Sequence, residues 1–293
     1  MHARNPKWSK TLTLTAATLL CAAALSVALA GELDFRPGFN LFSLPQDVEV
    51  GKENVALVAK QVPVLRDDTV TGYVRALGRR LHDFAPNNQS NYVWQFAVLD
   101  SAEVNAFALP GGYIFVNRAT LEAAQNEAEL AAVLAHEEGH VVLRHGTHQL
   151  SETMLAQAPL ALFEVMLGQD DSFARNVVHS IGAGVLEDAL LKNSRRMEAQ
   201  ADSVGAYILY RAGYDPHALP QFFAVVKQQH PEDSPAAQSF LSDHPDPGNR
   251  AKAVDEEIPE LGPAKSWATD ALAFQVMKNH LLSLPPPKCS GKP

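Results

Sequence analysis

A short motif with two histidines and a glutamate is the first place to look for chemistry. It reads His136-Glu137-Glu138-Gly139-His140 and lies in a stretch with helical periodicity. Four residues advance an α-helix by about 400°, so His136 and His140 share one face, about 6 Å apart along the axis. That spacing suits two imidazoles that hold one Zn²⁺ through bonds of about 2.0–2.1 Å. Glu137 lies beside this face and can take a proton from zinc-activated water, whereas Glu138 points about 100° further round, to solvent or to packing.

The residues before this motif argue against a merely exposed helix that carries two histidines. Residues 130–135 read Leu-Ala-Ala-Val-Leu-Ala, an apolar run that predicts burial. Histidines that continue a buried segment need partners, because burying unpaired polar groups is unfavourable. A metal ion supplies such partners, and we therefore interpret the motif as a zinc site.

A third ligand must come from elsewhere, because a catalytic zinc usually has three protein ligands and one open position. Glu198 and Asp202 share a helix face at i, i+4 spacing and would repel each other without a cation between them. In one interpretation Glu198 binds the metal and Asp202 accepts the outer N–H of a ligand imidazole. In the other, the two form a solvated acidic face that Arg195 and Arg196 offset. Spacing alone leaves both open.

The first thirty residues predict export. Residues 1–30 combine three basic residues, no acid, and an apolar run that ends Ala28-Leu29-Ala30, the pattern of a cleaved signal peptide. A retained membrane anchor is the alternative. Lipidation at Cys21 is disfavoured, because Leu20 is a poor residue directly before an acylated cysteine and because the apolar run continues past Cys21. We expect a protein of the periplasm or cell envelope.

Composition excludes several classes of protein. The formal charge is −9, and cleavage of the signal removes three of the 24 Lys and Arg residues and none of the 33 acids, leaving −12. Such a chain is a poor nucleic-acid binder, since phosphates require a basic face. The two cysteines cannot form a disulfide framework or a four-thiolate zinc site. A hydrophobic fraction of 46% with 19% charged residues indicates a folded chain.

The elements that position the motifs are mostly helical. A helix is expected to begin at Asn126, where Asn126 and Glu129 have cap-box spacing, and to stop near Gly146. Three extended stretches flank a Pro110-Gly111-Gly112 turn and predict a small antiparallel sheet. The fold class is thus α+β, mostly helical. The expected helices cover residues 48–84 in two pieces interrupted at Pro63, 126–146, 194–212, 217–229 and 266–283, and the expected strands cover 93–99, 105–109 and 113–116.

The motifs also carry a family resemblance. The sequence from Asn105-Ala106-Phe107-Ala108-Leu109-Pro110-Gly111-Gly112 through the 136–140 motif resembles exported members of metallopeptidase family forty-eight. Residues 194–202 are similar to the family's second motif, and the turn at 212–216 is a third likeness. The resemblance covers most of residues 38–255. It implies a zincin-like gluzincin domain over residues 31–262, followed by a C-terminal helix and Pro-rich tail at 263–293.

The resemblance implies a residue for each role in the site. It implies one Zn²⁺ per chain, bound by His136, His140 and Glu198, with Glu137 as the catalytic base and Asp202 behind the ligands. The sequence His244-Pro245, followed by Arg250, implies that His244 is an extra ligand in a resting state or a transition-state donor; a surface-loop histidine is the alternative. Substrate would add as a strand beside Gly111, Gly112, Tyr113 and Ile114, unless this is an ordinary hairpin turn.

These features lead to one principal functional hypothesis and two competitors. The principal one is an exported zinc endopeptidase that acts on unfolded or misassembled proteins in envelope quality control. The first competitor is a zinc-bearing, chaperone-like assembly factor whose site is normally closed, with the apolar segment 153–168 covering the cleft. The second is a zinc hydrolase with a substrate other than peptides. We expect no nucleic-acid partner and leave peripheral membrane association open.

Overall fold

The computed structural model describes residues 35–87, 92–157, 190, 193–229, 243–245 and 250–287. The expected signal peptide at 1–30 and most of the apolar segment 153–168 lie outside these ranges. Within them, no helix combines the length and the apolar character needed to cross a membrane.

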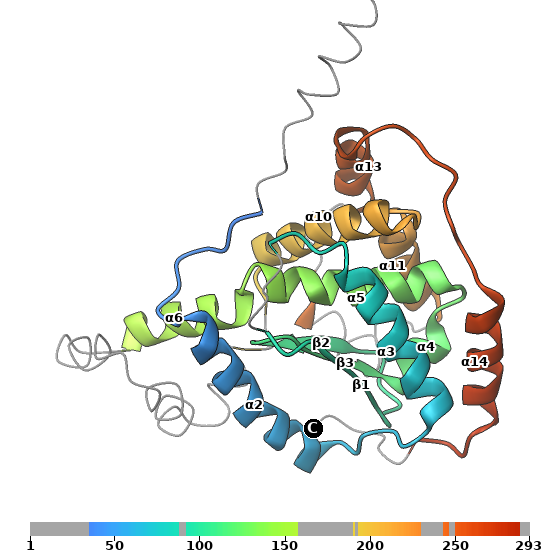
Figure 1. Cartoon of the computed structure of the whole chain (residues 1–293), viewed down its shortest axis with the longest axis horizontal. Helices are drawn as coiled ribbons and strands as arrows, with labels where there is room; N and C mark the ends of the chain where they lie inside the picture. Colours follow the sequence, from blue (N-terminus) through green and yellow to red (C-terminus); the bar gives the residue numbers. More distant parts are fainter. Residues whose placement is uncertain are drawn as a thin grey trace, which may run out of the picture.

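A three-stranded sheet lies beneath the helix that carries the 136–140 motif (Figure 1). It contains β1 (Gln95–Leu99), β2 (Ala106–Leu109) and β3 (Tyr113–Asn117) in the order β1-β3-β2. The mostly helical α+β class with a small sheet is confirmed, but the sheet is mixed: β2 pairs antiparallel with β3, and β1 pairs parallel with it. The expectation of an entirely antiparallel sheet was wrong for β1, because alternation along a strand is the same for either direction of its neighbour.

Helices cover both faces of this sheet (Figure 1). Helices α3 (Asp68–His82) and α5 (Glu127–Val142) pack on one face and α2 (Leu44–Gln61) on the other. The separation follows from the alternation of side chains along each strand. The α5 side buries Phe96, Val98, Ala106, Ile114 and Val116, and the α2 side buries Leu99, Leu109, Tyr113 and Phe115.

A second helical layer lies against α5. Helix α10 (Arg195–Ala212) runs alongside α5, and α11 (Ala218–Gln229) packs against the same helix (Figure 1). Gly213 ends α10 in a left-handed conformation with φ +88°, which confirms the turn predicted between the two helices. The helical pieces predicted before the sheet are also confirmed, as α2 and α3.

Several predicted boundaries shift. Helix α5 ends at Val142, and Gly146 lies inside a new helix, α6 (His145–Gln157), so the expected stop at Gly146 was wrong. Arg144, with φ +58°, makes the turn between α5 and α6. The short helix α4 (Arg118–Ala123) and the later helix α13 (Arg250–Leu261) were not predicted.

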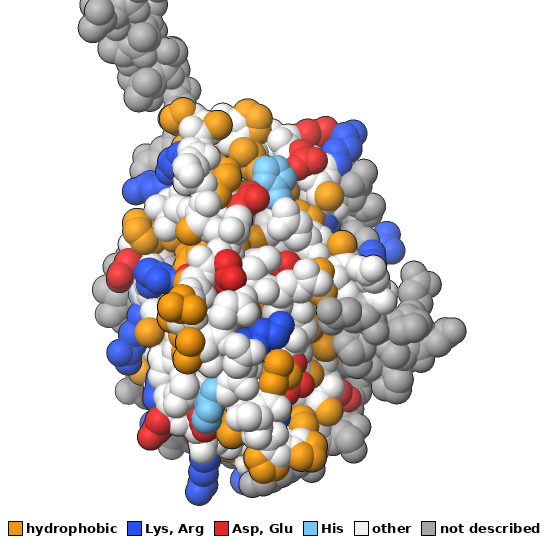
Figure 2. Space-filling model, turned by 90° about the vertical axis from the view of Figure 1, so that its right-hand side faces the viewer, with side chains coloured by type: hydrophobic (Ala, Val, Ile, Leu, Met, Phe, Trp, Pro, Cys, Tyr) orange, Lys and Arg blue, Asp and Glu red, His pale blue; other side chains and the backbone are white. Residues whose placement is uncertain are grey.

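The C-terminal helix shares the main core. Helix α14 (Leu272–Ser283) begins later than predicted and buries Phe274, Met277 and Leu281 in the core cluster that contains α3 and α5. On the side of the molecule that carries α14, hydrophobic, acidic and basic side chains are interspersed (Figure 2). The division of the chain at residue 262 stays a prediction.

Candidate metal centre

The motif helix places its two histidines in contact. Asn126 caps α5, because its side chain accepts from Glu129 N at 3.0 Å, as the cap-box spacing predicted. Every residue of α5 is buried. His136 Nε2 and His140 Nε2 are 3.0 Å apart and face the same side of the helix.

A close helix crossing brings the third predicted residue to this pair. A Cβ at Gly139 would lie only 2.8 Å from Ala201 O, so a glycine is what lets α10 approach α5 at this point. The crossing places Glu198 Oε2 3.3 Å from His136 Nε2 and Glu198 Oε1 3.3 Å from His140 Nε2. Glu198 is fully buried, so a solvated acidic face is ruled out for this residue.

His244 completes the cluster. Its Nδ1 lies 3.2 Å from Glu198 Oε2 and 3.3 Å from His136 Nε2. Its Nε2 lies 3.1 Å from the carbonyl oxygen of Ala106 on β2, and since that oxygen can only accept, Nε2 carries the proton. His244 is buried, which excludes the alternative of a surface-loop histidine.

The four donor atoms fit a metal ion. One ligand atom from each of His136, His140, Glu198 and His244 lies within 4.8 Å of the other three. Tetrahedral ligands at about 2.0–2.1 Å from Zn²⁺ stand about 3.3 Å apart, which matches the observed contacts of 3.0–3.3 Å. Glu198 Oε1 is buried without a hydrogen bond among the described residues. Such a set of nitrogen and oxygen atoms turned toward one another can hold a metal ion.

A buried ion pair lies behind the histidine–glutamate cluster. His136 Nδ1 lies 2.9 Å from Asp202 Oδ1, which puts the carboxylate beside the outer nitrogen of this ring. Arg250 holds Asp202 in turn through Nε and Nη2, at 2.7 and 2.6 Å, and reaches Glu198 Oε2 at 3.3 Å. Burial alone would raise the pKa of Asp202, but His136 and Arg250 lower it below its usual value.

Removing this guanidinium should destabilise the fold. We expect Arg250→Met to lower the free energy of unfolding by about 3–5 kcal/mol, because it leaves buried carboxylates without their partner. Urea unfolding of chelator-treated protein measures the difference without a contribution from metal. Arg211→Met, at an exposed arginine of α10, is the matched control and should shift the value by less than about 0.5 kcal/mol. An Arg250→Met variant as stable as this control would contradict the pairing.

The electrostatics of the cluster favour bound positive charge. Burial alone would raise the pKa of Glu198, but the neighbouring histidines, His244 first, lower it well below its usual value. Burial alone would lower the pKa of His244, but Glu198 and Glu137 raise it to about 10. The two shifts share one cause, which is the attraction between the buried Glu198 carboxylate and the imidazoles around it.

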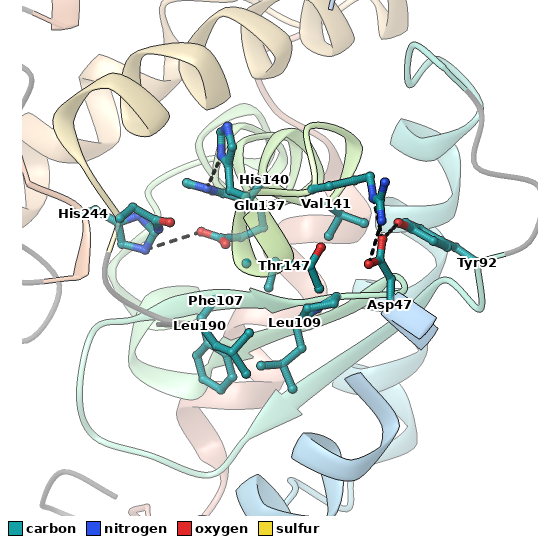
Figure 3. A pocket seen from close by; sticks show the side chains of 16 residues that line it. Asp47, Tyr92, Phe107, Leu109, Glu137, His140, Val141, Thr147, Leu190 and His244 are labelled. Atoms are coloured by element: carbon teal, nitrogen blue, oxygen red, sulfur yellow. Dashed lines mark hydrogen bonds and ion pairs between the residues drawn. The ribbon is translucent and has the colours of Figure 1, made fainter. Parts of the chain in front are cut away.

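A pocket opens beside the cluster. Figure 3 shows Glu137 and His244 at one end of it and Asp47 and Tyr92 at the other. Glu137 is buried, and its Oε1 lies 3.6 Å from His244 Nε2. The pocket encloses about 430 Å³, including its open mouth. Its apolar wall comes from both sides of the opening and comprises Phe107, Leu109, Pro110, Val141 and Leu190.

The expected substrate strand is corrected. The residues proposed for it, Gly111, Gly112, Tyr113 and Ile114, lead into or belong to β3, which is the central strand and pairs with a neighbour on each side. A central strand has no free main-chain edge for a peptide. Gly111 has φ +82° and lies against α2, so its conformation serves the turn rather than a ligand. The strand at the edge beside the metal cluster is β2, whose residues Phe107 and Ala108 also line the pocket.

Some residues around the site were missed or misread. His145 lies with its Nδ1 2.9 Å from His140 Nδ1, a contact with the site that was not predicted for this residue. Arg144 binds Asp47 through Nε at 2.6 Å and Nη2 at 2.9 Å, and Tyr92 hydrogen-bonds to the same carboxylate. Glu138 is 0% exposed, so of its two alternatives the packing role is confirmed and the solvent-facing one was wrong. Burial raises the pKa of Glu138 well above the usual value. The sequence carried no local signal for His145, because the left-handed turn that positions it falls on Arg144 and not on a glycine.

Comparison with known proteins places this geometry in a family. The family model described as peptidase family M48 matches residues 68–258, which is more than half of the chain and includes the 136–140 motif and Glu198. The chain belongs to peptidase family M48. The M48 match confirms the resemblance drawn from the two motifs.

Two curated relatives of this M48 chain illustrate the similarity. The beta-barrel assembly-enhancing protease of Escherichia coli K12 is 28% identical over 263 residues, covering 87% of this chain and 53% of the relative. The mitochondrial metalloendopeptidase OMA1 of Schizosaccharomyces pombe is 31% identical over 193 residues, covering 65% of this chain and 53% of the relative. The M48 chain thus spans about half the length of these relatives.

Proposed function

We propose that this chain is a zinc-dependent endopeptidase. The observation that carries the proposal is the buried set of donor atoms from His136, His140, Glu198 and His244, with the Glu137 carboxylate beside it, in a chain of an M48 family. Membership of a peptidase family favours this function over a zinc-bearing assembly factor and over a hydrolase of other substrates. One test is to incubate zinc-loaded protein with unfolded casein and map the products. New termini at internal positions support an endopeptidase, and trimming from the ends alone would contradict it.

The roles of the residues follow from their positions. We assign His136, His140 and Glu198 as the metal ligands and Asp202 as the group that fixes the ring of His136. Zinc held there would polarise a peptide carbonyl and lower the pKa of water. Glu137 has its carboxylate at the mouth of the site and acts as the proton carrier. It accepts a proton from the attacking water and delivers it to the leaving amine.

Substrate binding is proposed at the edge of β2. A peptide added there would pair through its main chain, as extended peptides do at sheet edges. The carbonyl oxygen of Ala106 accepts from His244 and not from a neighbouring strand, which supports binding of a peptide at this edge. The adjoining pocket, with Leu109 and Val141 in its wall, would receive an apolar side chain of the substrate.

The observed arrangement corresponds to a closed form of this site. His244 Nδ1 stands in the fourth ligand position, and its Nε2 uses the Ala106 carbonyl that a peptide would need. We therefore favour an extra ligand in a resting state over a transition-state donor for His244. Displacement of His244 would free both a metal position and the strand edge.

Replacing His244 separates these two roles. If the closed form holds about 90% of the molecules, its loss in His244→Ala raises casein cleavage about tenfold at equal zinc content. His217→Ala, which alters a half-exposed histidine paired with Asp215 and Asp255, is the control and should cleave as the parent does. A decrease below the parental rate would instead assign His244 to transition-state stabilisation.

The location and the substrates are proposed from the N-terminal sequence and from the relatives, not from the geometry of the site. We propose an exported protein of the periplasm or envelope, based on the signal-like pattern of residues 1–30 and on the similarity to a relative named as a beta-barrel assembly-enhancing protease. Unfolded or misassembled envelope proteins are the proposed substrates. The similarity to mitochondrial enzymes indicates that the domain also serves other compartments.

A further inference from the structure

The outer nitrogens of the two motif histidines face different partners. His136 Nδ1 faces the carboxylate of Asp202 at 2.9 Å. His140 Nδ1 instead faces Nδ1 of another histidine, His145, at 2.9 Å, and both of these rings are buried. Two ring nitrogens at hydrogen-bond distance must share one proton, because two N–H groups repel and two lone pairs gain nothing.

The environment of His140 decides which ring carries that proton. His140 Nε2 points at His136 Nε2 and Glu198 Oε1, the atoms of the cluster, and with a metal bound there it would offer a lone pair. A neutral imidazole with a bare Nε2 carries its proton on Nδ1. His140 is therefore the donor, and His145 is the acceptor with its own proton on Nε2.

The local fold holds His145 in this position. His145 is the first residue of α6, and the preceding residue, Arg144, turns the chain back with φ +58°. The Arg144 side chain is fixed by two contacts with the buried Asp47 of α2, at 2.6 and 2.9 Å. The ion pair between Arg144 and Asp47 therefore holds the turn in place, and the turn holds the His145 ring against His140.

We propose that His145 is the positioning residue for His140: it fixes the tautomer and orientation of this ligand without adding negative charge to the site. This inference rests on the proposed zinc function, because it concerns how His140 meets the metal. A neutral acceptor differs from Asp202, which adds negative charge behind His136. One ligand is thus supported by a carboxylate and the other by an imidazole, which limits the electron donation that would reduce the Lewis acidity of the ion.

Zinc affinity tests the proposal independently of catalysis. His145→Leu removes the acceptor and should weaken zinc binding about 10- to 100-fold in chelator competition, as is typical when the outer partner of a ligand is lost. His145→Asn puts an amide oxygen close to the position of Nδ1 and should stay within about threefold of the parent. His148→Leu is the control from the same helix: its ring bonds Phe39 O and lies near Glu152, and zinc affinity should be parental. Parental affinity in His145→Leu would overturn the proposal.

A spectroscopic measurement covers the case in which His145→Leu does not fold. Long-range ¹H–¹⁵N spectra of the zinc-loaded parent should show His145 protonated on Nε2 alone and His140 protonated on Nδ1. A proton on His145 Nδ1 would overturn the proposal. Casein cleavage is recorded in parallel. If the variants bind zinc with the expected order of affinities but neither the parent nor His244→Ala cuts casein, the positioning role stands and the peptidase function fails. If the parent cleaves and His145→Leu keeps parental affinity, only the positioning role fails.

Discussion

Replacing Glu137 with glutamine should abolish most peptide cleavage while the metal stays bound. The variant keeps the size and the burial of the side chain but cannot accept a proton, and loss of a general base typically lowers the rate by about 10²–10⁴-fold. The proposed ligands His136, His140 and Glu198 are untouched, so zinc content should equal that of the parent. The measurement is kcat for a fluorescent casein, together with zinc per chain.

The neighbouring glutamate provides the control for this substitution. Glu138 lies on the same helix but is fully buried away from the cluster, 4.0 Å from His82 Nδ1, and burial favours its neutral form by raising its pKa well above the usual value. Glutamine resembles a protonated glutamate in shape and charge, so Glu138→Gln should retain parental cleavage. If Glu137→Gln cleaved as well as Glu138→Gln, the assignment of Glu137 as proton carrier would be wrong.

Replacing Glu198 with glutamine should remove the metal itself. The substitution preserves the volume of a fully buried side chain but removes the charge that faces His136, His140 and His244. Loss of an outer partner costs about 10- to 100-fold in metal affinity, so loss of a charged ligand should cost more than about 100-fold. Chelator competition and zinc content after gel filtration measure this loss, and cleavage should fall with it.

A second effect distinguishes loss of the ligand from loss of the fold. Zinc that binds only the folded chain raises its unfolding temperature, and this increase should be present in the parent and absent in Glu198→Gln. Gln200→Glu adds a charge on the same helix at a partly exposed position outside the cluster and should keep the response to zinc. A Glu198→Gln protein that bound zinc as tightly as the parent would contradict the ligand set.

Local sequence patterns were sufficient for the parts of the site that lie within one helix. The spacing of His136 and His140 requires a shared face, and the Asn126 cap sets where that helix begins. The pairing of Glu198 with these histidines depended on the family resemblance, because no local rule shows which helices cross. The structure supplies the reason, which is the close approach of Ala201 to Gly139.

The main errors at the site concern long-range arrangement. The strand pattern correctly predicted three strands but could not show that β3 is central, so Gly111 to Ile114 were assigned to a substrate edge that they do not form. His145 was missed because its role depends on the left-handed turn at Arg144. Such a turn is usually predicted from a glycine, and this position is an arginine. His244 lies 108 positions after His136, and its contact with Ala106 could come only from the fold.

The most direct measurement of the central claim is reversible zinc-dependent cleavage. Purified protein is stripped with a chelator, assayed on unfolded casein, reloaded with one equivalent of Zn²⁺ and assayed again, with products identified by mass spectrometry. We predict no cleavage after stripping and restored cleavage at internal peptide bonds after reloading, for both the parent and His244→Ala. Cleavage that survives complete removal of zinc, or its absence from both zinc-loaded proteins, would contradict the account.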